Sequence, residues 1–177
     1  GLVHTSLAAL APELARRCLT MIAPSKTYNT AGLGCALAVI PDPNRRTAFQ
    51  RAAQGLVPGV NPLGYVAALA AWRDGEHWRQ ALVAYLRANR DRLVAAVNAH
   101  PGLAVQAPQA TYLAWVDCRG LEPADPQAAF EAAGIGPSDG RPFAGEGFVR
   151  LNFGCPRATL DRALERLPLV GSGISSD

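Results

Sequence analysis

The stretch Leu19-Thr20-Met21-Ile22-Ala23-Pro24-Ser25-Lys26-Thr27-Tyr28-Asn29 decides how the rest of the chain is interpreted. An apolar run stops at Pro24, and Ser25 and Lys26 follow at once. Lys26 is the only lysine in the chain, so every other basic residue is an arginine, which keeps its proton in proteins. A lysine amine can be tuned to lose that proton, so Lys26 is a candidate for Schiff-base chemistry followed by proton transfer. An ordinary solvated lysine is the alternative, and composition alone does not separate the two.

The composition excludes several classes of function. The chain has 177 residues, 49% of them hydrophobic, which is enough to bury a core in one or two domains. The net charge of +3 is scattered, and no basic run predicts a nucleic-acid surface. The four cysteines are far apart and show no metal or redox spacing, which favours buried or half-buried thiols in a reducing compartment. No signal peptide or membrane-spanning run is visible, so we expect a cytoplasmic protein without a metal.

The order of apolar segments predicts an α/β fold. Residues 18–23 and 33–40 are continuous apolar runs, and we expect strands that are buried on both faces, as in a parallel sheet. A long helix at residues 76–99 carries an aromatic and aliphatic stripe that we interpret as core packing. We expect a large-domain portion at residues 1–75, a small α+β domain at 76–167 and a flexible tail at 168–177.

Several segments resemble one enzyme family. The quoted stretch with Ala31-Gly32-Leu33-Gly34 resembles the cofactor-lysine segment of pyridoxal-phosphate (PLP) enzymes of fold type I. The match is closest to the MalY/PatB-type cystathionine β-lyase branch of the class I/II aminotransferase family. It continues to about Leu167 through the following segments: Asn61-Pro62, Thr111 to Trp115, and Gly147 to Arg157. Many aminotransferases carry a phosphate-binding arginine where this chain has Gly34, a departure that favours the lyase-like branch.

The resemblance implies a fold and an extent. The chain would be the C-terminal part of the PLP-dependent transferase fold, formed by the end of the large α/β domain and a small α+β domain. The family's pyridine-pairing aspartate, ring-stacking aromatic residue and glycine-rich phosphate turn have no counterpart here. We therefore expect a piece of a longer enzyme that is inactive by itself.

Three residues are candidate cofactor ligands: Lys26, Ser25 and Asn61. Lys26 would bind PLP covalently and move the substrate Cα proton, with its pKa lowered by partial desolvation. The Ser25 hydroxyl would donate to the cofactor phosphate, or else make a local turn hydrogen bond. The resemblance places Asn61 near the cofactor of a neighbouring subunit, although helix capping explains Asn61 equally well. Tyr28 fits packing better than catalysis.

Arg150 is the candidate substrate ligand. It lies between Val149 and Leu151 in a strand pattern, where a charge is costly unless it has a partner. The resemblance implies that this partner is the substrate α-carboxylate, bound by the two-pronged guanidinium; a structural ion pair is the alternative. Asn152 shares the face of Arg150 if the strand alternates, and could orient it. Tyr112 and Trp115 fall on opposite faces of their strand. We expect core packing for each, and the alternative is that one of them lines the substrate mouth.

These residues predict a PLP-dependent homodimeric enzyme that acts on amino acids, either a C–S β-lyase of the cystathionine β-lyase type or an aminotransferase. Two alternatives remain open. One is a non-catalytic fragment or interaction domain that packs against a partner. The other is a PLP-free Schiff-base lyase, against which the Arg150 segment argues.

Overall fold

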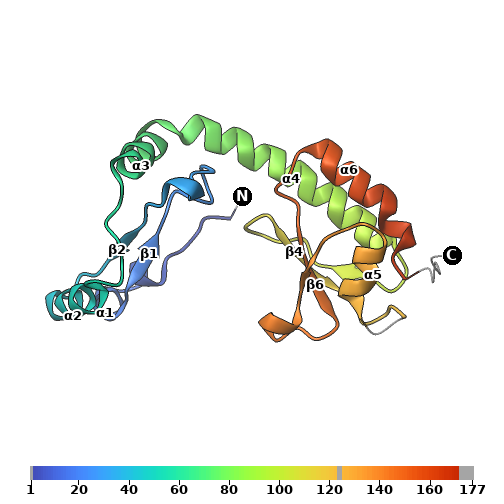
Figure 1. Ribbon diagram of the computed structural model, residues 1–177, viewed down its shortest axis with the longest axis horizontal. Coiled ribbons are helices and arrows are strands. Elements are labelled where there is room, and N and C mark those ends of the chain that lie inside the picture. Colours follow the sequence, from blue (N-terminus) through green and yellow to red (C-terminus); the bar gives the residue numbers. More distant parts are fainter. Residues whose placement is uncertain (1, 123–124, 172–177) are drawn as a thin grey trace. The chain divides into compact units, whose positions relative to one another are not determined.

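The computed structural model describes residues 2–122 and 125–171 and divides the chain into two compact units, residues 1–81 and 82–177 (Figure 1). The boundary lies inside helix α4 (Glu76–Ala99), a few residues after the domain boundary that the sequence predicts at residues 75 and 76. Helix α4 has the same bounds as the predicted helix, because Gly75 precedes it and Pro101-Gly102 follows it.

The first unit contains short elements in the following order: η1 (Leu7–Ala9), α1 (Pro12–Arg17), β1 (Thr20–Ile22), η2 (Ala31–Leu33), β2 (Leu37–Val39), α2 (Pro43–Ala53) and α3 (Pro62–Asp74). Helices η1 and α1 do not form one continuous helix. Ala11, between them, is extended with φ of −159°. The ring of Pro12 disfavours helical geometry at the preceding residue, so the chain must break there.

The paired strands of the first unit correct a prediction. Strands β1 and β2 pair antiparallel, with Thr20 opposite Val39 and Ile22 opposite Leu37. They are not buried on both faces, since Met21 is 66% exposed and Val39 is 49% exposed. Among residues 2–122 and 125–171 no third strand pairs with this ribbon, so its apolar side chains have little to pack against.

Side-chain caps start the two longer helices of the first unit. The Asp42 Oδ1 atom accepts a 2.8 Å hydrogen bond from the Arg45 N–H at the start of α2. The Asn61 Oδ1 atom accepts a 2.8 Å bond from the Gly64 N–H at the start of α3. Proline occupies the first position of both helices, where its missing N–H has no helical partner to lose. The cap predicted at Asn61 is confirmed.

The second unit is built on an antiparallel sheet. It contains β3 (Ala104–Val105), β4 (Leu113–Asp117), α5 (Pro126–Ala132), β5 (Ser138–Asp139), η3 (Arg141–Phe143), β6 (Phe148–Asn152), α6 (Arg157–Arg166) and η4 (Leu167–Leu169). The strand order is β3-β4-β6-β5, and every pair is antiparallel. Helix α5 is capped by Asp125, whose Oδ1 atom accepts a 3.1 Å bond from the Ala128 N–H.

One face of this sheet forms the core with the helices of the second unit (Figure 1). Val116 of β4 and Val149 of β6 are fully buried against the following helical residues: Leu93 and Val97 of α4, Phe130 of α5 and Leu160 of α6. Burial alternates along both strands, as their period of two requires. The opposite face carries the more exposed residues of β4 and β6, among them Trp115 and Arg150.

The stripe along α4 is only half in the core. Leu93 and Val97 are buried, as expected, whereas Trp78 and Tyr85 are 46% and 40% exposed. A helix of 24 residues is about 36 Å long, and a strand of five residues is about 17 Å long. The sheet can therefore cover only part of α4, so the prediction of core packing is wrong for the first turns.

The predicted tail starts too early. Residues Leu167–Leu169 form η4, and Val170 is 2% exposed and belongs to the core of the second unit. An apolar residue at position 170 anchors the segment to the core, which a flexible tail would not do. The remainder of the predicted tail, residues 172–177, lies outside the described residues.

In the part of the chain that the structure describes, no helix is long and apolar enough to span a bilayer, and no cluster of three or more His, Cys, Asp or Glu residues could hold a metal ion. All four cysteines are free thiols, and Cys118 is buried.

Truncation of an aromatic side chain should lower the free energy of unfolding more in the core than at the surface. Phe130 is fully buried and Phe143 is 52% exposed. We expect Phe130→Ala to lower the free energy of unfolding by about 3–5 kcal/mol, because it leaves a cavity, and Phe143→Ala to lower it by less than about 1 kcal/mol. Urea denaturation of the two variants measures the difference; equal losses would contradict the assigned core.

The buried thiol should be chemically inert. Burial raises the pKa of Cys118 from 9.0 to about 12, so we expect iodoacetamide at pH 8 to leave Cys118 unmodified in the native chain. Since the unfolded thiol ionises first as the pH rises, the stabilisation from Cys118 is present below pH 9 and declines between pH 9 and pH 12. Mass spectrometry reads the alkylation, with half-buried Cys35 and the urea-denatured chain as controls. Modification of native Cys118 at the rate of Cys35 would refute its burial.

Candidate functional site

Lys26 occupies the middle of a hydrogen-bonded turn that follows β1. The Tyr28 N–H donates a 2.8 Å bond to the Pro24 carbonyl, and the Thr30 N–H donates a 3.0 Å bond to the Ser25 carbonyl. Pro24 is among the most deeply buried residues of the chain. The backbone that carries Lys26 is therefore fixed by bonds on both sides and by a buried ring on one side.

The Lys26 side chain is exposed, and among residues 2–122 and 125–171 its amine has no hydrogen-bond or ion-pair partner. The prediction of a partly desolvated amine is therefore wrong for this chain, because no other segment of the first unit covers the side chain. A free amine on a fixed turn nevertheless suits a covalent role, since neither a carboxylate nor a carbonyl competes for it.

Tyr28 packs, as the sequence predicts. Its ring lies 6.1 Å from the ring of Trp78, measured between centroids. A Cβ atom on Gly75 would approach the Tyr28 ring within 2.7 Å, so glycine at this position admits the ring. The contact ties the lysine turn to the start of α4.

The two other candidates of the first unit differ in their availability. Ser25 is half-buried, and its hydroxyl makes no hydrogen bond within the described part of the chain, which leaves it free for a ligand. Asn61 uses both ends of its amide, since Nδ2 donates a 2.9 Å bond to the Leu33 carbonyl and Oδ1 caps α3. The structure thus assigns Asn61 a capping role, and its cofactor role stays a prediction.

Arg150 lies at the centre of β6 on the open face of the sheet in the second unit. Its neighbours across the sheet are Trp115 of β4 and Ser138 of β5. One terminal nitrogen of Arg150 donates a 3.2 Å bond to the Ser138 hydroxyl, and the guanidinium lies 4.6 Å from the centroid of the Phe143 ring. The side chain is half-buried and forms no ion pair with any carboxylate among the described residues. The structural ion pair, which was the alternative for Arg150, is absent there.

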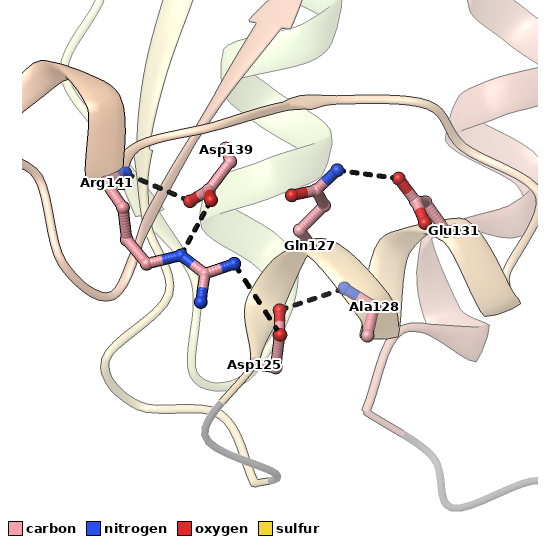
Figure 2. Close-up of polar contacts among 6 residues, drawn as sticks. All are labelled: Asp125, Gln127, Ala128, Glu131, Asp139 and Arg141. Atoms are coloured by element: carbon pink, nitrogen blue, oxygen red, sulfur yellow. Dashed lines mark hydrogen bonds and ion pairs between the residues drawn. The ribbon is translucent and has the colours of Figure 1, made fainter.

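The acids of the two neighbouring strands, Asp117 of β4 and Asp139 of β5, are paired with other arginines. Asp117 accepts two bonds from the Arg119 guanidinium, at 2.6 and 2.9 Å, and this contact lowers the pKa of its carboxyl. Figure 2 shows Arg141 between Asp139 and Asp125. The Arg141 backbone N–H and guanidinium both bond to Asp139 and hold the pKa of that carboxyl below its ordinary value.

Asn152 shares the open face with Arg150, as strand alternation predicts. Its Oδ1 atom, however, accepts a 2.8 Å bond from the Gly154 N–H. The structure thus gives Asn152 a role in the turn after β6, and a bond to Arg150 is not among its described contacts. A role in orienting Arg150 or in binding substrate remains a prediction.

An aromatic cluster on the open face was not predicted. Trp115 stacks on Phe148 with centroids 5.5 Å apart and meets the edge of Phe143 at 6.2 Å. Core packing was expected for Trp115, but its strand position is opposite Arg150, so its ring faces outward. Tyr112 does pack against the core. The alternation Ala114-Trp115-Val116 was the available signal, because two small apolar residues flank the indole and occupy the inner face.

The family follows from comparison with known proteins. The model for aminotransferase class I and II matches residues 2–167. The chain belongs to this family. Cystathionine beta-lyase PatB of Bacillus subtilis is 35% identical over 175 residues, which cover 94% of this family member and 45% of PatB.

Solved structures give the same fold. OvoB superposes on this aminotransferase-family chain with a TM-score of 0.94 and 49% identity, over 98% of the chain and 46% of OvoB. Cystalysin from Treponema denticola, whose structure contains pyridoxal 5'-phosphate, superposes with a TM-score of 0.86 and 28% identity, over 95% of the chain and 44% of cystalysin. The fold class predicted from sequence, part of the PLP-dependent fold type I, is confirmed. The chain spans less than half the length of these proteins.

Close packing on the open face should be sensitive to one methyl group. A Cβ atom on Gly145 would collide with the Trp115 indole, whereas one on Gly136 would meet nothing within 4 Å. We expect Gly145→Ala to cost about 1–3 kcal/mol of stability through overpacking and to change the near-ultraviolet circular dichroism of Trp115. The matched control Gly136→Ala should change neither. Equal behaviour of the two variants would contradict the described position of the indole.

Proposed function

We propose that the protein containing this chain is a PLP-dependent enzyme that cleaves a C–S bond in an amino acid by β-elimination. The observation that carries the proposal is the state of Arg150, a half-buried guanidinium that the chain keeps free of every described carboxylate. A charge in such a place needs an anionic partner, and the α-carboxylate of an amino acid matches a planar guanidinium with two parallel hydrogen bonds.

The donor set of the first unit fits PLP. Lys26 offers a free amine on a fixed turn, and the adjacent Ser25 hydroxyl is free to donate to a phosphate. When bound, PLP supplies an aldehyde for the amine and an electron sink for the reacting amino acid. Lys26 would hold the cofactor, and after displacement by substrate its amine would take the proton from the substrate Cα atom. Arg150 would fix the carboxylate and thereby orient the Cα–H bond.

Elimination is favoured over transamination by the relatives. PatB, at 35% identity, is named as a cystathionine beta-lyase. We extend this activity to the present protein, with a sulfur amino acid such as cystathionine as substrate. Both reactions begin with loss of the same Cα proton, and the second candidate within the family is an aminotransferase. We also propose a cytoplasmic homodimer, on the resemblance alone.

A second candidate function is a non-catalytic domain that packs against a partner. It is favoured by the exposed apolar surface of the first unit, on which Met21, Val39 and Leu69 are all close to half exposed or more. Under this reading the chain by itself holds no PLP, and Lys26 is an ordinary surface lysine.

Cofactor binding separates the two candidates. The polypeptide encoded by the complete reading frame that includes this sequence should develop a visible absorbance band with PLP. Lys26→Ala should abolish the band, and Lys26→Arg should abolish it as well, because a guanidinium keeps the charge but does not condense with the aldehyde. A band that survives both substitutions would refute the role of Lys26. Absence of any band would favour the second candidate.

Product analysis tests the reaction. With L-cystathionine, β-elimination releases homocysteine as the leaving thiol, and hydrolysis of the remaining unsaturated amino acid gives pyruvate and ammonia without a keto-acid co-substrate. We expect Arg150→Ala to raise KM roughly 10- to 100-fold, the value of one or two hydrogen bonds to a charged group, and Arg150→Lys to restore only part of the loss, because an ammonium lacks the planar fork. Activity that depends strictly on an added keto acid would identify an aminotransferase instead.

A further inference from the structure

We propose that Ser138 and Phe143 are positioning residues that hold the Arg150 guanidinium ready for a carboxylate, on a segment that Arg141 anchors. The inference rests on the proposed function of Arg150. It assigns roles to residues that neither the sequence pattern nor the family comparison picked out.

Ser138 and Phe143 restrain Arg150 in different ways. The Ser138 hydroxyl accepts one N–H of the terminal nitrogen at 3.2 Å. The Phe143 ring lies over the guanidinium at 4.6 Å, and such a contact fixes the plane of the cation without using its donors. A guanidinium has five N–H donors, so most of the fork remains available for an anion. The long side chain loses less rotamer freedom on binding when it is restrained beforehand.

The segment that carries both residues is built independently of any ligand. The Gly140 N–H donates a 3.0 Å bond to the Phe148 carbonyl, and the Gly145 N–H donates a 3.0 Å bond to the Gly140 carbonyl, which closes the loop around η3. Any side chain on Gly140 would collide with the carbonyls of Gly145 and Phe148, so the loop closes at this distance only with glycine. The ring of Phe143 is therefore presented by a fixed turn.

Arg141 anchors this turn on its other side and binds the neighbouring acid, Asp139 (Figure 2). Its Nε atom donates a 2.6 Å bond to Asp139, and its guanidinium lies 3.8 Å from Asp125, the cap of α5. Asp139 pairs across the sheet with Val149, whose side chain is in the core, whereas Ser138 pairs with Arg150. Adjacent residues of β5 thus belong to opposite faces of the sheet. The Ser138 hydroxyl bonds to Arg150, and the Asp139 carboxylate binds Arg141.

The experiment compares two ligands that differ only in the carboxylate, L-alanine and ethylamine. Their dissociation constants are measured on the PLP-loaded protein from the complete reading frame, through the change in cofactor absorbance. We expect Ser138→Ala and Phe143→Leu each to raise the dissociation constant of L-alanine roughly 2- to 10-fold, the range of one hydrogen bond or one cation–π contact. The dissociation constant of ethylamine should not change. Arg157→Gln is the matched control, because it removes another guanidinium of the second unit that lies over an aromatic ring, 5.0 Å from the centroid of Tyr85, and it should alter neither constant.

A double-mutant cycle separates positioning from general loosening of the sheet. In an Arg150→Ala background, Phe143→Leu should not change the dissociation constant of L-alanine any further. The inference is overturned if Phe143→Leu weakens the binding of both ligands equally, if it still weakens L-alanine binding without Arg150, or if Arg157→Gln has the same effect. If Arg150→Ala itself leaves the ratio of the two constants unchanged, the proposed function of Arg150 fails instead. If Arg150→Ala changes the ratio and both positioning variants do not, only the present inference fails.

Discussion

The pairing of β6 with β4 is the constraint on which the second unit depends. The register places Val149 opposite Val116, on the side of the helices, and Arg150 opposite Trp115, on the open side. Because side chains alternate with a period of two, a shift of one residue would turn the guanidinium into the core and both valines outward. Burial of a charge without a partner is far more costly than the loss of a few methyl contacts. The same apolar packing that stabilises the sheet therefore fixes the face to which Arg150 belongs.

Much of this arrangement can be predicted from the sequence. The alternation Phe148-Val149-Arg150-Leu151 identifies the strand and the outward arginine, and the Asn61 and Asp125 caps identify two helix starts. These signals are local, since a cap or an alternating strand is specified within a few residues. The support of Arg150 is not local. Ser138 lies in a strand of two residues, too short to show a period, and its contact with Arg150 depends on sheet order, which no short pattern encodes.

In the first unit the sequence pattern predicts more burial of apolar side chains than the described residues provide. Continuous apolar runs at β1 and β2 are typical of strands covered on both faces, yet Met21 and Val39 are largely exposed. The same lack of cover explains why Lys26 is exposed in place of being partly desolvated. Sequence patterns report the environment for which a strand is suited, whereas the exposure of a side chain depends on every segment packed around it. The chain spans 45% of PatB, and the predicted burial of β1, β2 and Lys26 needs surface beyond the described residues.

Arg150 stands apart in an arginine-rich chain. Several arginines lie beside an acid close in sequence, as Arg73 does with Asp74 and Arg79 with Glu76, and such exposed pairs contribute little to stability. The acids of the strands beside β6 are paired in the same way. Arg119 binds Asp117, which lies on the same face of β4 as Trp115, whereas Asp139 lies opposite core-facing Val149 and is bound by Arg141. Arg150 differs from the exposed arginines in its position, because it is half-buried at the centre of a fixed sheet, where an anion gains more from binding than at an exposed site.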